Sequence, residues 1–288
     1  MWPKALVEEL ASRRCVVFLG AGASAGCLNG DDPPKSPPNW PQLLEALKAI
    51  VRDPASIPIA EGLIQKEKYL DAAEVLFGSI NPADFSALIR EALAEPRFQP
   101  SSIHESVVNL DPKIVITTNY DEIYDNYCKS GDEPGLYNVC KYYETHLVSD
   151  LRSPVRQIIK SHGCISDPSK IVLTRSQYFR EKQHYPNFYR VLDALFLTKT
   201  ILFLGYSISD PDIQLLLENS NITYKASHPH YALIGAGMNP SIKSAYKEAY
   251  NIDFIEFPEG DYEQANEMLV ELVGLVQRRR EANPAMGG

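Results

Sequence analysis

The sequence predicts an α/β fold built on a Rossmann-like, doubly wound parallel sheet of about six strands. Short runs of apolar and β-branched residues recur along the chain with little alternation, which is typical of strands buried on both faces. Between these runs lie stretches whose apolar residues recur at helical spacing. Strands that alternate with helices build parallel sheets through crossover connections, so helices are expected on both faces of this sheet.

Six runs have this strand character. In chain order they are CVVFL (15–19), KIVIT (113–117), RQIIK (156–160), TILFL (200–204), HYALI (230–234) and IDFIEF (252–257). Helical spacing predicts helices over residues 39–51, 68–77, 83–94, 185–197, 212–220 and 262–277. Two helix starts are indicated by an N-cap residue followed by proline, at Asn81-Pro82 and Asp210-Pro211.

The first two predicted strands are far apart in the sequence. Residues 28–100 contain helical patterns and the proline-rich stretches DDPP and SPP, which favour extended loop. We therefore expect 28–100 to form a helical insertion that caps the mouth of the sheet, within one domain spanning 1–288. The last residues, RRREANPAMGG (278–288), are expected to be frayed.

Composition narrows the class of protein. The 288 residues are 44% hydrophobic and 23% charged, as in ordinary globular proteins, and the net charge is 28 − 37 = −9. That charge repels phosphate backbones, so no direct nucleic-acid binding is expected, and no apolar run approaches the ~18 residues of a membrane helix. The five cysteines are odd in number and form no C-x-x-C pair. Neither a disulfide framework nor a structural zinc site is expected, and the cytoplasm is the predicted location.

Two motifs follow the first two predicted strands. FLGAGAS (18–24) brings glycines to a strand-to-helix turn, where bare N–H groups attract anions, although a tight turn alone would also explain it. ITTNYDEIYD (116–125) places polar residues at the carboxyl end of a parallel strand, where the ligand crevice lies. Helix capping by Asn119 or Asp121 is an alternative explanation for one of these polar residues.

Two further motifs follow the third and fourth predicted strands. In IIKSHG (158–163), His162 is a candidate general base or a structural histidine, and Gly163 allows a sharp turn or close ligand approach. Cys164 is predicted to be a buried, inert thiol. ILFLGYSISDPDI (201–213) repeats the design of strand, glycine and small hydroxyl residue, with Asp210 or Asp212 as helix cap. Four strand ends thus present GAGAS, TTNYD, SHG and GYS to one predicted crevice.

In this order, the four motifs resemble the sirtuin-type, SIR2-like NAD-binding domain. The resemblance runs from about residue 15 to about residue 275: GAG-x-S at 20–24, T-x-N-x-D at 117–121, His-Gly at 162–163 and G-x-S at 205–207. Protein-deacylating sirtuins carry a four-cysteine zinc module after His-Gly, whereas residues 164–200 here contain only Cys164. They also carry a Phe-Gly-Glu segment, which CISDPSK replaces. The chain is instead similar to bacterial SIR2-like effectors of anti-phage defence, including the SIR2 subunit of SIR2–HerA systems.

This resemblance implies an NAD+ glycohydrolase that releases nicotinamide from ADP-ribose and depletes the cell of NAD. NAD is then the substrate, and the reaction needs no metal. By resemblance, Asn119 would orient water or ribose hydroxyls, His162 would act as base, and Asp121 would order the nicotinamide side. The remaining contacts to NAD are assigned, also by resemblance, to Gly20, Ala21, Gly22 and Ser24 at the diphosphate, to Thr117, Thr118 and Gly163 in the crevice, and to Gly205 and Ser207 at the adenosine side.

Control of such a hydrolase is expected to come from assembly. We expect a homo-oligomer and a separately encoded partner, above all a HerA-type ATPase, with the insertion gating the pocket. Two other functions stay open at this point. One is a sirtuin-type deacylase or ADP-ribosyltransferase, and the other is a regulatory subunit that binds NAD or ADP-ribose without turnover.

Overall fold

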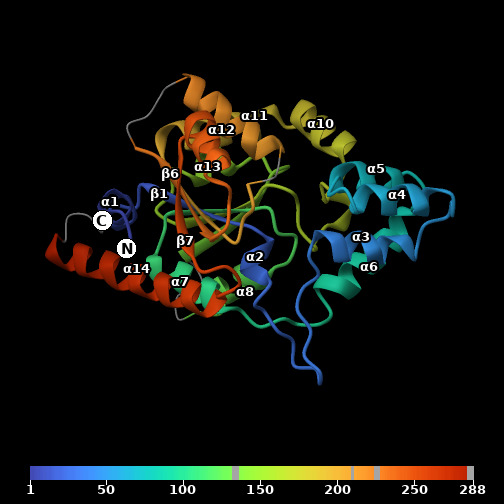
Figure 1. Ribbon diagram of the computed structural model, residues 1–288, viewed down its shortest axis with the longest axis horizontal. Helices are drawn as coiled ribbons and strands as arrows, with labels where there is room; N and C mark the ends of the chain where they lie inside the picture. Colours follow the sequence, from blue (N-terminus) through green and yellow to red (C-terminus); the bar gives the residue numbers. More distant parts are fainter. Residues whose placement is uncertain (132–135, 209–210, 224–227, 284–288) are drawn as a thin grey trace.

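A parallel sheet of seven strands forms the centre of the molecule (Figure 1). The computed structural model describes residues 1–131, 136–208, 211–223 and 228–283. The strand order is β3-β4-β2-β1-β5-β6-β7, and every neighbouring pair is parallel. On one side of β1 lie β2, β4 and β3, in that order outward. On the other side lie β5, β6 and β7, which come later in the chain. This reversal beside β1 creates the switch point outside which open α/β sheets bind ligands.

All six predicted strands are present. They are β1 (Cys15–Leu19), β2 (Ile114–Thr117), β4 (Arg156–Lys160), β5 (Thr200–Leu204), β6 (His230–Gly235) and β7 (Ile252–Phe257). The seventh, β3 (Tyr137–Lys141), was not predicted, so the count of about six is one short. Its sequence YNVCK buries only Cys140, because β3 lies at the sheet edge, and it therefore lacks the continuous apolar run of an interior strand.

Helices cover both faces of the sheet, which confirms the predicted doubly wound α/β fold (Figure 1). One face packs against α1 (Lys4–Ala11), α7 (Ser102–Leu110), α8 (Ile123–Lys129) and α14 (Tyr262–Ala282). The other packs against α11 (Pro186–Thr198), α12 (Pro211–Thr223) and α13 (Pro240–Tyr250). Strand β1 shows why its run is continuous: Val17 and Leu19 enter the first core, and Val16 and Phe18 enter the second.

Residues 28–100 contain four helices that share an apolar core of their own. These helices are α3 (Trp40–Lys48), α4 (Ser56–Ile64), α5 (Tyr69–Phe77) and α6 (Pro82–Leu93), grouped to the right of the sheet in Figure 1. Their core also takes in Tyr120, which follows β2, and Cys164 and Ile165, which follow β4. The group therefore packs at the carboxyl ends of these strands. Its boundaries at 28–100 within a single 1–288 domain, and its role as a cap, stay predictions.

The six predicted helices correspond to α3, α5, α6, α11, α12 and α14. Helices α4, α7, α10 (Arg175–His184) and α13 were not predicted, and neither were the short α2 (Ala21–Ser24) and α9 (Leu147–Asp150). In α10 only Tyr178 is buried, so this helix offers little apolar face for the sequence to reveal. Helix α13 has no fully buried residue, but its Tyr246 and Tyr250 pack partly buried against the core, so its helical spacing was present in the sequence and was overlooked. Within the described ranges, no helix has the length and apolar character needed to cross a bilayer.

Helix ends gave one confirmed expectation and one correction. The Asn81 side chain accepts a hydrogen bond from the Ala83 N–H and caps α6 as predicted, whereas Asp210 lies outside the described residues. Helix α14 continues to Ala282, so the first part of the tail predicted to be frayed is helical. The Arg280 guanidinium explains this, because it donates to backbone carbonyls that include that of Leu110.

Candidate active site

The four motifs converge at one edge of the sheet because they follow four adjacent strands. The strands β4, β2, β1 and β5 are neighbours in that order, and their last residues are in register: Lys160 with Thr117, Thr117 with Leu19, and Leu19 with Leu204. Hydrogen bonding continues past the strands, since the Ser161 N–H donates to the Thr117 carbonyl at 3.0 Å. The expected meeting of the motifs at one edge is therefore what the fold produces.

Glycines pack the turn after β1 directly onto the turn after β5. Gly205 has φ of +60°, and a Cβ atom there would lie 2.2 Å from the Ala23 nitrogen. Cβ atoms on Gly20 and Gly22 would lie 2.5 and 2.8 Å from the Gly205 carbonyl oxygen. Such distances exclude any side chain. Close backbone packing therefore accounts for all three glycines, and their predicted contacts to NAD stay predictions.

The backbone N–H groups of this turn are mostly engaged within the protein. The Gly20 N–H donates to the Leu204 carbonyl at 3.0 Å, and the Gly22 N–H donates to the Gly205 carbonyl at 2.8 Å. Ala21 is exposed, and its N–H has no backbone acceptor among the described residues. If the turn meets a diphosphate, Ala21 is thus the position whose N–H is available for it.

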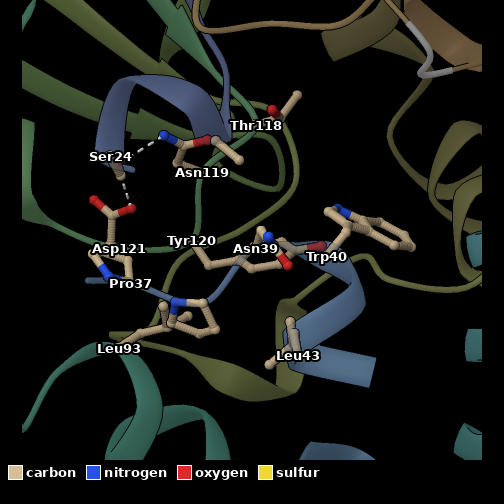
Figure 2. A pocket seen from close by; sticks show the side chains of 12 residues that line it. Ser24, Pro37, Asn39, Trp40, Leu43, Leu93, Thr118, Asn119, Tyr120 and Asp121 are labelled. Carbon is tan, nitrogen blue, oxygen red and sulfur yellow. Dashed lines mark hydrogen bonds between the residues drawn. The ribbon is translucent and has the colours of Figure 1, made fainter. Parts of the chain in front are cut away.

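Asn119, Ser24 and Asp121 form a hydrogen-bonded relay (Figure 2). The Asn119 Nδ2 donates to the Ser24 Oγ at 3.1 Å and to the Gly20 carbonyl at 3.0 Å. The Ser24 hydroxyl in turn donates to Asp121 Oδ2 at 3.0 Å. Both amide hydrogens of Asn119 are therefore used, and no described residue donates to its Oδ1 atom. The side chain is held so that Oδ1 remains able to accept a hydrogen bond from a ligand.

Asp121 has two roles, and helix capping is one of them. Its Oδ1 accepts from the Ile123 N–H at 3.1 Å at the start of α8, while its Oδ2 accepts from Ser24. Thr117 is buried and supports the same loop: its hydroxyl donates to the Leu19 carbonyl and accepts from the Asn119 N–H, both at 3.0 Å. Through these two hydrogen bonds, Thr117 holds the loop after β2 in place.

A buried ion pair lies beneath this loop. The Lys160 ammonium donates to the Asp121 carbonyl and is 3.1 Å from Asp125 Oδ2, and both side chains are almost completely buried. Burial is the largest single influence on the Lys160 pKa and lowers it, but the negative groups around it, Asp125 first among them, together raise the pKa above its ordinary value. Burial raises the pKa of Asp125, which Lys160 only partly offsets. This pair fixes the loop after β2 to strand β4.

His162 is buried beside Tyr178 of α10. The Tyr178 hydroxyl is 3.3 Å from His162 Nδ1, and the two rings meet edge to face with centroids 4.9 Å apart. Gly163 follows with φ of +88°, and a Cβ there would lie 2.4 Å from the Lys170 carbonyl oxygen. His162 lies two residues after Lys160, just as Asn119 lies two residues after the paired Thr117. The two side chains thus occupy equivalent positions on neighbouring strands, and their joint action on NAD stays a prediction.

A pocket of about 60 Å³ lies next to the relay (Figure 2). Its lining residues are Ala21, Ser24, Pro37, Pro38, Asn39, Trp40, Leu43, Leu93, Thr118, Asn119, Tyr120 and Asp121. Half of this lining comes from residues 28–100, and Figure 2 shows Trp40 and Leu43 across from Ser24. The pocket is much smaller than the roughly 300–1,000 Å³ typical of small-molecule sites.

The pocket divides the predicted site residues into two groups. Those that line it are Ala21, Ser24, Thr118, Asn119 and Asp121. Those predicted but not in its lining are Gly20, Gly22, Thr117, His162, Gly163, Gly205 and Ser207. Sequence reasoning missed the wall formed by Pro37 to Leu43. The signal that was available is the capping box of Asn39 with Gln42, which starts α3 directly after the proline-rich stretch.

Comparison with known proteins supports the family resemblance. Residues 113–255 match the family described as SIR2-like domain, and the resemblance found in the sequence is confirmed. The match begins at the strand that precedes TTNYD and includes the SHG and GYS motifs.

Curated relatives match a larger part of the chain. It is 26% identical over 232 residues to NAD(+) hydrolase ThsA of Acinetobacter baumannii (strain 532279), covering 79% of this chain and 44% of that protein. It is 27% identical over 237 residues to NAD(+) hydrolase ThsA of Enterococcus faecium, covering 80% and 45%. Defense-associated sirtuin 2 of Bacillus subtilis is 24% identical over 218 residues, covering 74% and 20%. The chain spans less than half the length of each of these three relatives.

Proposed function

We propose that this chain is an NAD+ hydrolase that acts as an effector of bacterial anti-phage defence by depleting NAD. The observation that carries the proposal is the Asn119–Ser24–Asp121 relay at the carboxyl edge of a SIR2-like sheet. The names of the relatives support it, since NAD+ is the substrate of an NAD+ hydrolase and one relative is a defence-associated sirtuin. The reaction needs no metal ion.

The reaction breaks the bond between nicotinamide and ribose. Nicotinamide leaves as a neutral molecule, positive charge develops on the ribose, and water adds to give ADP-ribose and a proton. The Asn119 Oδ1 would accept from that water or from a ribose hydroxyl, because Ser24 and Gly20 hold its Nδ2. The buried Asp121 carboxylate lines the pocket and would stabilise the positive charge of the transition state.

His162 is assigned the role of general base. Its Nδ1 is placed beside the Tyr178 hydroxyl, and we therefore assign the proton transfer to Nε2. Exact placement of water and proton transfer to a base together contribute several powers of ten to the rate. Ala21 and Ser24 would meet the diphosphate, and Ser207, which is exposed after β5, would meet the adenosine side.

Product analysis after incubation with NAD+ tests the proposal. The wild type should release nicotinamide and ADP-ribose in equal amounts, and Asn119→Ala and His162→Ala should each lower the rate by roughly 100-fold or more. The exposed Asn126 and His184 provide matched controls, so Asn126→Ala and His184→Ala should retain the wild-type rate. Binding of NAD+ without turnover would favour a regulatory subunit, and transfer to an acceptor would favour a deacylase or ADP-ribosyltransferase.

We assign gating of the pocket to the insertion, residues 28–100. The pocket is too small for a dinucleotide, and Trp40 and neighbouring residues close one side of it. Binding of NAD+ should therefore displace this wall and change the fluorescence of Trp40. The chain has only two tryptophans, and Trp2 is buried with its ring N–H donating to the Met268 carbonyl, so a signal lost in Trp40→Phe identifies its source. An unchanged emission on saturation with NAD+ would contradict the gating.

The proposals of a homo-oligomer and of a HerA-type ATPase partner rest on the family resemblance. Size-exclusion chromatography with light scattering tests the first, and co-purification with such an ATPase tests the second. The assignment to the cytoplasm has separate support, because all five cysteines are free and buried, as expected in a reducing compartment.

A further inference from the structure

A group of metal-binding side chains lies at the end of edge strand β3, apart from the candidate active site. Cys140 belongs to β3, His146 directly precedes α9, and Asp150 is the last residue of α9. The Cys140 Sγ, a His146 ring nitrogen and an Asp150 carboxylate oxygen all lie within 4.8 Å of one another. Thiolate, imidazole and carboxylate are the three protein ligand types of zinc.

The separations of these atoms, at most 4.8 Å, span the range of a tetrahedral zinc site, and one pair is closer than that range. Bonds of about 2.0–2.3 Å to zinc place ligand atoms about 3.3–3.8 Å from each other. His146 Nδ1 is 2.5 Å from Asp150 Oδ2, a direct hydrogen bond that an ion bound between the two groups would replace. Cys140 is completely buried and His146 is half exposed, so the group is anchored in the protein on one side and accessible from solvent on the other.

Further residues hold the three side chains in the way that outer-shell residues hold metal ligands. The Asn138 Nδ2 donates to Asp150 Oδ2 at 2.7 Å and to Gln157 Oε1 at 3.1 Å, which connects the carboxylate to β4. Glu144 Oε2 is 3.8 Å from His146 Nε2, on the ring nitrogen opposite Asp150. A histidine bound to metal through one nitrogen usually meets a carboxylate or carbonyl at the other. The Lys141 N–H fixes Glu144 through a bond of 2.7 Å to Oε2.

A simple ion pair explains only part of this arrangement. A protonated His146 between Asp150 and Glu144 would need no thiol, yet Cys140 lies beside both ring and carboxylate. A second group with potential ligands, Glu122, Asp125 and Cys164, is less suited to an ion. In that group Asp125 is already paired with the Lys160 ammonium, and the Cys164 thiol donates to the Glu122 carboxylate.

We propose that Cys140, His146 and Asp150 bind a divalent transition-metal ion, with Zn²⁺ as the fitting type, and that water completes its coordination. Glu144 and Asn138 orient the ligands without binding the ion. The ion joins α9 to the edge strand β3 and stabilises the segment between them. It takes no part in NAD+ hydrolysis, so this site exists whether or not the chain has that activity.

Titration of the untagged, metal-free chain with ZnCl₂, followed by calorimetry, tests the proposal. We expect one Zn²⁺ per chain, a higher melting temperature with Zn²⁺, and reversal by chelator. Co²⁺ provides a second probe, because a cysteine thiolate bound to Co²⁺ gives a ligand-to-metal absorption band that His and Asp alone do not. His146→Ala is at the surface and should fold, and it should weaken Zn²⁺ binding by roughly 100-fold or more, whereas Asn138→Ala should weaken it roughly 10-fold.

Control variants separate this site from others on the chain. His184→Ala removes another exposed histidine, and Cys164→Ser removes the thiol of the second group. Neither should change the affinity for Zn²⁺, whereas Cys140→Ser should abolish the Co²⁺ band. The proposal is overturned if the wild type does not bind Zn²⁺, if His146→Ala binds it as tightly as the wild type, or if Cys164→Ser is the variant that loses it.

Discussion

Replacing Ser24 by alanine removes one hydroxyl that connects two parts of the candidate active site. This hydroxyl donates to Asp121 Oδ2 at 3.0 Å and accepts from Asn119 Nδ2 at 3.1 Å, and it is almost completely buried. In the variant, Asp121 keeps only its bond from the Ile123 N–H, and Asn119 keeps only its side-chain bond to the Gly20 carbonyl. Asp121 is itself buried, so water can replace the lost bond only from the adjoining pocket.

The magnitude follows from these bonds. A hydrogen bond to a charged group contributes about 1.5–3 kcal/mol, so the free energy of unfolding should fall by about 2 kcal/mol. Asn119 loses one of the two hydrogen bonds that orient its side chain. If this raises the activation free energy by about 1.4 kcal/mol, kcat falls roughly 10-fold. If Ser24 instead served mainly to bind the diphosphate of NAD+, the loss would appear in KM with kcat little changed.

Two assays on the same protein separate these outcomes. Urea denaturation gives the free energy of unfolding, and the initial rate of nicotinamide release as a function of NAD+ concentration gives kcat and KM. Ser101→Ala is the matched control, because the Ser101 hydroxyl is also buried and donates to the Ala23 carbonyl at 2.9 Å, but it does not touch the relay. Ser101→Ala should lower stability and leave kcat unchanged. A Ser24→Ala variant with wild-type kcat and raised KM would refute the positioning role.

Three further predictions concern stability, each measured by denaturant unfolding. Lys160→Met leaves the buried Asp125 carboxylate without its partner and should cost about 3–5 kcal/mol, whereas adding Asp125→Leu should recover most of it; a single variant as stable as the wild type would contradict the buried pair. Burial lowers the pKa of His104 and His230 from 6.5 to about 4. As the pH is lowered from 7 to 5, the unfolded chain therefore takes up protons that the folded chain does not, so the free energy of unfolding should fall by about 2 kcal/mol per histidine. His230→Asn should reduce this loss by about half. An unchanged dependence of the free energy of unfolding on pH would disprove the assignment. Gly205→Ala places a Cβ against the Ala23 nitrogen at positive φ and should cost about 3 kcal/mol or more, so near-wild-type stability would show that the two turns are not packed as described.

The sheet was predictable because its interior strands are buried on both faces. In β1, alternate residues enter opposite cores, which forces every position to be apolar and makes the run visible in the sequence. Strand β3 at the edge has no such constraint, and it was missed. Helix α10 buries only Tyr178 and has almost no apolar periodicity, so the sequence could not reveal it. Burial on a defined face is what makes an element predictable from sequence.

The site was predictable as a set of strand ends but not as a set of interactions. Polar residues after parallel strands must meet at one edge, which placed Asn119 and Asp121 together. Their common partner Ser24 lies about a hundred residues earlier in the chain, and a bond over that separation depends on register and rotamer. The sequence could not show whether Asp121 caps α8 or belongs to the candidate site. In the structure it does both, because one carboxylate oxygen accepts from the Ile123 N–H and the other accepts from the Ser24 hydroxyl.

For the glycines too, the sequence indicated a position in the site but not the group that contacts it. Gly205 was assigned, by resemblance, to a contact with the adenosine side of NAD. The structure shows the turn after β1 in that space, with no room for a Cβ atom. Sequence identifies that something approaches a glycine closely but does not identify what approaches. The insertion and the helix that contains Trp40 were predicted, but not which of their residues line the pocket, because a helical pattern does not show which side chains face the strand ends.

The most direct test of the central claim is a crystal structure of Asn119→Ala bound to intact NAD+. The claim is that positions 119 and 162 act on the same ribose. The predicted result is the nicotinamide ribose between residue 119 and the His162 imidazole, with the diphosphate beside Ala21. A dinucleotide bound elsewhere on the molecule, or a His162 side chain out of reach of the ribose, would contradict it.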